Sequence, residues 1–265
     1  MDPTAQFKEQ QKAAWANFAL FENMTGTVAP RLVAFAGVKP GSKVLDVGCG
    51  SGVVGLTAAR LGAKVTGVDL TPELVARAKE NSKLIGVEAE WREGDAEALP
   101  LPDASFDFVV SQFGHMFAPR PDVAIREMLR VLKRGGVIAF ATWPPEMFVG
   151  RMFAVNGKYA PPPPPGVSPP GQWGDPNIVR ERLGAGVKDI TFARDVMLLQ
   201  MLSPQHYRQF METNFGPAKR LIEGLDKSDP AKANALRREL EQLAAEYFEN
   251  NTLRQDYLLT RAVKV

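Results

Sequence analysis

Apolar runs of strand length alternate with helix-forming stretches through the first half of the chain. The runs that predict buried strands lie at residues 44–47, 64–68, 89–92, 106–111 and 137–143. The stretches that predict helices lie at residues 53–61, 72–85 and 121–132. Strands that alternate with helices at this spacing predict an α/β fold with a parallel, doubly wound sheet and helices on both faces.

The flanks of this region are mostly helical in pattern. Helices are predicted at residues 4–22, 24–37, 146–159 and 175–183, from Ser203 onward and after Ser228, with strands within 187–199 and 251–265. The aromatic stripe of the first helix either packs in the core or covers a ligand cleft. The run Pro161–Pro165 predicts a polyproline II segment, which is either a rigid surface connection or a strap that shapes a lid.

Composition narrows the class of protein. Hydrophobic residues make up 45% and charged residues 23% of the 265, and the net charge of +2 gives no reason to expect nucleic acid. No apolar run approaches the ~20 residues that span a bilayer, and the N-terminus lacks a signal-peptide pattern. With Cys49 as the single cysteine, we expect a cytoplasmic protein built around one large core.

The stretch KVLDVGCGSGVVG, residues 43–55, predicts a buried strand, a tight glycine turn and the start of a helix. Gly50-x-Gly52-x-x-Gly55 matches a dinucleotide fingerprint. Asp46, at the end of the strand, argues against a pyrophosphate, because two like charges about 5 Å apart repel by roughly 3 kcal/mol at an effective dielectric of about 20. The same charge attracts a ligand with an ammonium and a sulfonium, which favours S-adenosylmethionine. A dinucleotide, or a turn with no ligand, remains an alternative.

Two further aspartates follow successive predicted strands. Asp69 stands about 20 residues beyond the glycine turn, at the position where an acidic side chain hydrogen-bonds the ribose of a bound nucleotide. Asp95 comes after the third strand. Because the carboxyl ends of parallel strands meet at one edge, we expect Asp46, Asp69 and Asp95 to gather there. Three acceptors suit a ligand whose polar groups are mostly donors: an ammonium, two ribose hydroxyls and an adenine amine.

The chain also resembles a known family. The stretches VLDVGCGSG, GVDLTPELVARAK, GDAEALPLPDASFDFVVSQFG and EMLRVLKRGGVIAFATW, within residues 43–143, resemble the class I S-adenosylmethionine-dependent methyltransferases. The likeness is strongest to the type found in ubiquinone and menaquinone biosynthesis. It implies a Rossmann-like, seven-stranded, mostly parallel sheet whose last strand is antiparallel. By the resemblance, the cofactor would contact Asp46, Gly48, Gly50 and Ser51 with its methionine part, Asp69, Leu70, Asp95 and Ala96 with its adenosine, and Ser111 and Gln112 beside the methyl group.

His115, in the loop SQFGHMFAPRP after the fourth strand, is the candidate general base, and a role in shaping the pocket is the alternative. His206 lies at the start of a later helix, where a functional role is less favoured. No cluster of side chains has metal-ligand spacing, so no metal is predicted. Seven apolar residues follow the two strands that face the cleft, and they either line an apolar pocket or belong to the core: Phe113, Met116, Phe117, Trp143, Met147, Phe148 and Met152.

These observations predict one methyltransferase domain over residues 1–265. Its parts would be cover helices (1–37), a cofactor-binding core (43–143), a proline-rich lid insertion (144–186) and C-terminal strands and helices (187–265). We expect transfer of a methyl group from S-adenosylmethionine to a small, apolar or aromatic acceptor on oxygen or carbon, with S-adenosylhomocysteine as product. The alternatives are a protein that binds this cofactor without transferring its methyl group and a nicotinamide-dependent oxidoreductase. The sequence carries no signal for an oligomeric state.

Overall fold

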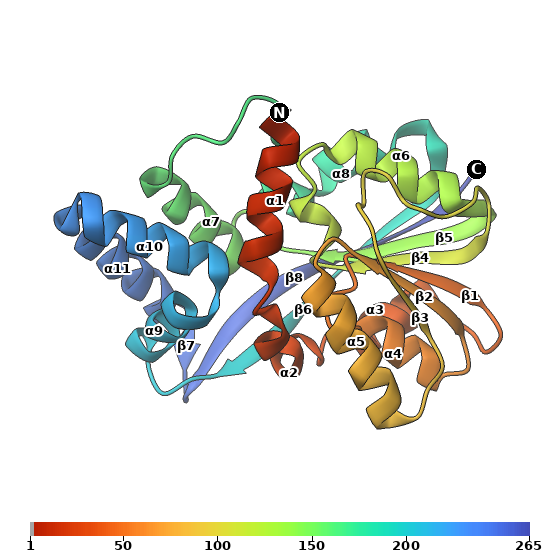
Figure 1. The fold of residues 1–265 in the computed structure, drawn as a ribbon, viewed down its shortest axis with the longest axis horizontal. Helices are drawn as coiled ribbons and strands as arrows, with labels where there is room; N and C mark the ends of the chain where they lie inside the picture. Colours follow the sequence, from red (N-terminus) through yellow and green to blue (C-terminus); the bar gives the residue numbers. More distant parts are fainter. Residues whose placement is uncertain (1–2) are drawn as a thin grey trace.

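A sheet of eight strands forms the centre of the computed structural model, which describes residues 3–265 (Figure 1). The strands are β1 (Lys43–Val47), β2 (Lys64–Asp69), β3 (Glu90–Glu93), β4 (Phe106–Gln112), β5 (Leu132–Thr142), β6 (Val187–Gln200), β7 (Phe248–Glu249) and β8 (Thr252–Lys264). Seven of them lie in the order β3-β2-β1-β4-β5-β8-β6, and the two-residue β7 pairs with β8. β8 runs antiparallel to both of its neighbours in this order, while the strands from β3 to β5 pair in parallel. The Rossmann-like sheet with an antiparallel last strand is therefore confirmed, and β7 is an addition.

Helices cover both faces of the sheet. α3 (Ala29–Ala36), α4 (Val53–Arg60) and α5 (Pro72–Ile85) pack on one face. α6 (Pro121–Val131) and α8 (Pro176–Leu183) lie on the other face, as Figure 1 shows. Pro72 and Pro121 stand at first helical positions, where the missing N–H costs no hydrogen bond. None of the helices within residues 3–265 combines the length and apolar character that crossing a bilayer requires.

Several predicted boundaries are wrong, among them that of the helix expected over residues 24–37, whose main part, α3, begins only at Ala29. The helix expected over residues 4–22 is broken into α1 (Pro3–Trp15), a 3₁₀ turn (Phe18–Phe21) and α2 (Glu22–Thr25). The break lets Phe18 stack on Phe21, with ring centroids 5.0 Å apart. β5 begins at Leu132 rather than after a turn at Gly135, which instead takes a positive φ of 73° next to a register shift within the strand.

The antiparallel pair of β6 and β8 extends beyond the rest of the sheet. The last pair between β5 and β8 joins Thr142 to Leu258, whereas β6 and β8 continue to pair as far as Gln200 and Thr252. The extension supports a group of helices at the carboxyl edge of the sheet, seen at the left of Figure 1: α7 (Phe148–Tyr159), α9 (Pro204–Asn214), α10 (Gly216–Ser228) and α11 (Pro230–Ala245). α1 stands between this group and the sheet.

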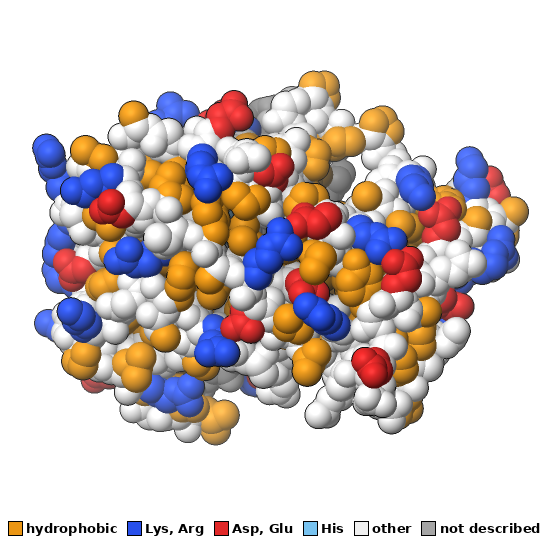
Figure 2. Space-filling model, turned by 180° about the vertical axis from the view of Figure 1, so that it is seen from behind, with side chains coloured by type: hydrophobic (Ala, Val, Ile, Leu, Met, Phe, Trp, Pro, Cys, Tyr) orange, Lys and Arg blue, Asp and Glu red, His pale blue; other side chains and the backbone are white. Residues whose placement is uncertain are grey.

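Charges of both signs are mixed over the surface. Figure 2 shows Lys and Arg interspersed with Asp and Glu on the face opposite to that of Figure 1. The mixture agrees with the formal net charge of +2. On this face of the described chain, the charged side chains do not form a continuous basic stripe.

The turn after β1 crosses the loop after β4 at two glycines. A Cβ added to Gly48 would lie 2.8 Å from the Gly114 Cα, and one added to Gly114 would lie 2.5 Å from the Gly48 carbonyl oxygen. Both contacts are with backbone, so neither can be relieved by moving a flexible side chain. Only glycine at both positions allows the two loops to approach so closely.

This crossing predicts a difference between two substitutions in the same turn. Gly48 and Gly50 both have positive φ, 65° and 54°, but a Cβ on Gly50 meets nothing within 4 Å. We expect Gly50→Ala to lower the free energy of unfolding by about 1–2 kcal/mol through backbone strain alone. Gly48→Ala should lower it by about 1–3 kcal/mol more, because of the added overlap. Urea denaturation followed by circular dichroism measures both, and equal losses would contradict the account.

Candidate functional site

A continuous cavity opens at the carboxyl ends of the parallel strands, where open α/β sheets bind ligands. Its empty volume is about 1470 Å³, counted out to the open mouth. One side is formed by four strand-end loops, which contribute Gly48–Ser51, Asp69–Thr71, Gly94–Ala96 and Gln112–Gly114. The other side is lined mostly by apolar side chains from α1, the 3₁₀ turn after it, α7, α9 and the extended part of β6 and β8. The cavity therefore has a polar strand-end half and an apolar half.

Asp69 supports the glycine turn and also faces the cavity. Its Oδ2 accepts a hydrogen bond from the Gly50 N–H at 2.8 Å, and its Oδ1 accepts one from the Thr71 N–H at 2.9 Å. Burial raises the pKa of Asp69, and the two N–H donors oppose that rise. Each carboxylate oxygen has a further lone pair beyond these bonds. Asp69 is thus an acceptor at the polar wall, as the sequence predicts.

Asp46 lies behind the turn and does not line the cavity. It is 1% exposed, and its Oδ2 accepts a hydrogen bond from the Gly55 N–H in the first turn of α4 at 2.9 Å. Burial raises its pKa to about 7. The cavity lining does not support the expected contact between Asp46 and a ligand: its Oδ2 joins β1 to α4, and its Oδ1 is buried without a hydrogen-bond partner among the described residues. With Asp46 away from the cavity, the charge argument against a pyrophosphate loses its basis, because an acid at the position of Asp69 suits the ribose of a dinucleotide as well as that of an adenosyl ligand.

The expected contact between Ser111 and the cofactor is also corrected, because Ser111 does not line the cavity. Gln112 does line it. Ser111 is fully buried; its Oγ donates to the Val47 carbonyl at 2.6 Å and accepts from the His115 N–H at 3.1 Å. The Gln112 Nε2 donates to the Thr25 carbonyl at 2.8 Å. The Gln112 Oε1 is buried without a hydrogen-bond partner among the described residues. Gln112 therefore holds an unused acceptor at the wall of the cavity.

His115 belongs to the core and not to the site. It begins a 3₁₀ turn (His115–Phe117) that directs its ring between Phe140 and Trp173, with both ring centroids 4.6 Å away. The ring is 1% exposed, and neither nitrogen has a hydrogen-bond partner within residues 3–265. Burial, with a smaller effect of the Arg182 charge, lowers its pKa to about 3. The expectation that His115 removes a proton from a substrate is thereby corrected.

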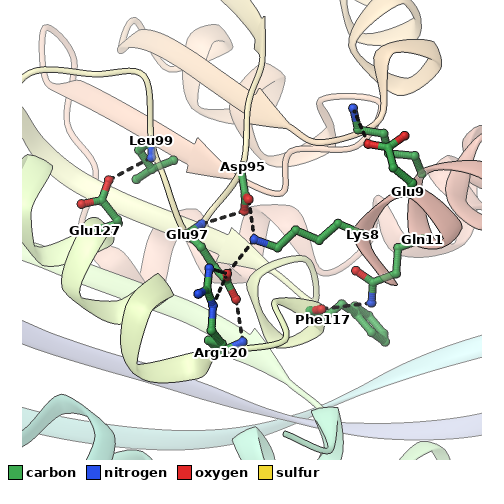
Figure 3. Close-up of polar contacts among 10 residues, drawn as sticks. Lys8, Glu9, Gln11, Asp95, Glu97, Leu99, Phe117, Arg120 and Glu127 are labelled. Atoms are coloured by element: carbon green, nitrogen blue, oxygen red, sulfur yellow. Dashed lines mark hydrogen bonds and ion pairs between the residues drawn. The ribbon is translucent and has the colours of Figure 1, made fainter. Parts of the chain in front are cut away.

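α1 is held against the polar half by ion pairs (Figure 3). The Lys8 Nζ lies 2.5 Å from Asp95 Oδ2 and 2.6 Å from Glu97 Oε2. Glu97 is buried, and its other oxygen accepts from the Arg120 N–H at 2.6 Å. Gln11 donates to the Phe117 carbonyl at 3.1 Å. α1 therefore forms a wall of the cavity, with Lys8 beside the expected adenine-edge residue Asp95.

The remaining predicted cofactor residues lie at the polar wall. Gly48, Gly50, Ser51, Leu70 and Ala96 all line the cavity together with Asp69, Asp95 and Gln112. Within residues 3–265, no group of three or more His, Cys, Asp or Glu side chains is arranged to hold a metal ion. His206 lies outside the cavity lining, and its Nδ1 accepts a hydrogen bond from the Leu202 N–H at 3.2 Å.

The apolar half contains four of the seven predicted residues. Phe113, Phe117, Trp143 and Met152 line it, whereas Met116, Met147 and Phe148 do not. Phe113 takes a positive φ of 61° and stacks on Trp143, with centroids 3.8 Å apart. The sequence left the aromatics of the first helix, Trp15, Phe18 and Phe21, open between core and cleft cover. It did not place these further lining residues at the cavity: Val149, Phe153, Met197, Leu199, Tyr207, Met211, Phe215 and Gln255. Helical spacing marked the aromatics of the first helix, but no local signal placed β6, α9 or β8 at the cavity.

Comparisons with known proteins agree with this geometry. Residues 45–140 match the family model described as a methyltransferase domain. The chain is 36% identical to an uncharacterized protein of Mycobacterium tuberculosis over 257 residues, which cover 96% of this chain and 93% of that one. It is 42% identical over 103 residues to the ubiquinone biosynthesis O-methyltransferase of Xanthomonas axonopodis pv. citri, covering 38% of this chain and 43% of that one. A putative methyltransferase from Bacillus halodurans has a similar fold, with a TM-score of 0.59 and 21% identity over 90% of this chain and 99% of that chain.

The burial of His115 predicts a pH dependence of stability. The unfolded chain binds a proton on this histidine below pH 6.5, whereas the folded chain does so only near pH 3. Stability is therefore lost as the pH falls from 6.5 toward 3, by at most about 1.4 kcal/mol per pH unit. His115→Phe, which keeps a ring between Phe140 and Trp173, should remove this loss. Urea denaturation at pH 7 and pH 5 tests it, and equal losses in the variant and the wild type would show that the ring is not buried as a neutral base.

Proposed function

Because this chain belongs to the class I S-adenosylmethionine-dependent methyltransferases, we propose that it transfers the methyl group to a small, mostly apolar acceptor, on oxygen or carbon. The observation that carries the proposal is the continuity of the cavity from the strand-end loops to the apolar half. An apolar chamber joined to the cofactor site suits an acceptor whose surface is mainly hydrocarbon. The small-molecule acceptor and a cytoplasmic location are parts of this proposal.

The polar half fits a phosphate-free adenosyl ligand. Asp69 would accept hydrogen bonds from the ribose hydroxyls with its free lone pairs, and Leu70 would pack against the adenine. Asp95 and Ala96 would meet the adenine edge, with Lys8 adjusting its ion pair to Asp95. The backbone of Gly48, Gly50 and Ser51 would lie along the methionine part.

The apolar half indicates how the chain would assist transfer. When bound, the cofactor supplies a sulfonium methyl group with a good leaving group. Titratable residues of the described lining are Lys8, Glu22, Cys49, Asp69 and Asp95, which lie toward the strand-end half, and Tyr207 in the apolar half. We therefore propose that the protein acts by positioning the acceptor and excluding water, which supplies up to roughly 7–11 kcal/mol. The acceptor would enter in its nucleophilic form.

We also propose that residues 3–265 work as one methyltransferase domain with a closed acceptor side. α1 and the 3₁₀ turn after it would cover the ligand, since Lys8, Gln11, Trp15, Phe18 and Phe21 line the cavity. The segment 144–186 would contribute to the lid through α7, from which Val149, Met152 and Phe153 line the cavity. The proline run 161–165 contributes no lining residue, which favours its interpretation as a rigid surface connection.

The cofactor assignment predicts the effect of removing one acceptor. Asp69→Asn should weaken binding of S-adenosylmethionine by at least about tenfold, because a hydrogen bond between a ribose hydroxyl and a charged group contributes about 1.5–3 kcal/mol. Isothermal titration calorimetry measures the affinity, and circular dichroism checks the fold, since Asp69 also holds the glycine turn. Asp103→Asn is the matched control, because Asp103 is largely exposed and pairs with Arg130 away from the cavity lining. An unchanged affinity in Asp69→Asn would contradict the assignment.

A further inference from the structure

Two polar side chains, Tyr207 on α9 and Gln255 on β8, stand among the apolar residues that line the acceptor half. They are 4% and 5% exposed. Their neighbours in the lining include Met152, Met197 and Leu199, which offer no oxygen or nitrogen atom in their side chains. A polar pair in such surroundings costs free energy unless its hydrogen bonds are satisfied.

The hydroxyl group of Tyr207 donates only to a weak acceptor. The side chain of Gln255 lies beside the phenol and acts to lower the pKa of Tyr207, against the larger effect of burial. The Tyr207 hydroxyl donates to the thioether sulfur of Met152 at 3.4 Å. Thioether sulfur is a weak acceptor, so the donor of Tyr207 has no strong partner in the described chain. Burial raises the pKa of Tyr207, so the hydroxyl keeps its proton and remains a donor near neutral pH.

Packing alone does not account for this tyrosine. Its ring lies edge-on to Phe148, with centroids 5.4 Å apart, and phenylalanine would make the same contact. A ligand oxygen in the cavity would replace the Met152 sulfur with a much better acceptor. The Gln255 amide, beside the phenol, offers both a donor and an acceptor to the same oxygen.

We propose that Tyr207 and Gln255 bind a single oxygen of an otherwise apolar acceptor and so determine which molecules the enzyme selects. The substrate class is an aromatic or aliphatic molecule that carries one hydroxyl or carbonyl group. This inference rests on the proposed function, because it describes the acceptor of the same reaction. The pair positions the acceptor and takes no part in proton removal.

The test compares two probes that differ by one hydroxyl group, para-propylphenol and propylbenzene. Each is titrated against the protein saturated with S-adenosylhomocysteine, and binding is followed by ligand-observed NMR. The wild type should bind the phenol about tenfold more tightly than the hydrocarbon, the ratio expected for one well-placed hydrogen bond. Tyr207→Phe should remove this preference while leaving the affinity for propylbenzene unchanged.

Further variants separate recognition from packing. Gln255→Leu should also reduce the preference, whereas Met152→Leu should keep it, because the thioether is only a substitute partner. Tyr159→Phe is the matched control, since the Tyr159 hydroxyl donates to Glu239 outside the cavity lining. Equal affinities of the wild type for both probes, or a loss in Tyr207→Phe that is the same for both, would overturn the inference and leave the proposed function intact. Failure of the wild type to bind S-adenosylhomocysteine would overturn both.

Discussion

Side chains from three neighbouring strands hold the backbone of the glycine turn, and the cavity depends on that restraint. Asp46 of β1 accepts from Gly55, Asp69 of β2 accepts from Gly50, and Ser111 of β4 donates to the Val47 carbonyl. The turn therefore keeps its shape without a ligand, so the polar wall is largely pre-formed. A pre-formed wall avoids the entropic cost of ordering a loop when a ligand binds.

The glycines of this turn also serve packing. A Cβ on Gly52 or Gly55 would lie 2.8 Å from the Trp91 indole, and one on Gly67 of β2 would lie 2.3 Å from it. Trp91 is buried, and its Nε1 donates to Ser82 Oγ at 2.7 Å. Two glycines of the dinucleotide-like string, Gly52 and Gly55, are therefore explained by packing, because a side chain at either position would overlap the Trp91 ring. This is a physical reason why such a string is weak evidence for a particular ligand.

The sequence predicted the sheet well and the site in part, for reasons that differ between residues. Strand and helix patterns are local, and the helix from Pro72 to Ile85 has the expected bounds. Asp46, Ser111 and His115 stand beside the right turns, but one residue of a strand or a 3₁₀ turn decides whether a side chain faces the cavity or the core. Tyr207 and Gln255 meet at the cavity only because β6 and β8 extend beyond β5. Pairing between segments so distant in the chain leaves no mark in local spacing.

A crystal structure with S-adenosylhomocysteine bound would show directly how the cavity holds its ligand. We expect ribose hydroxyls on Asp69, the adenine edge near Asp95 and the sulfur turned toward the apolar half, with Asp46 still bonded to Gly55 and out of contact with the ligand. A ligand held by Asp46, or one bound away from the Asp69 carboxylate, would contradict this expectation.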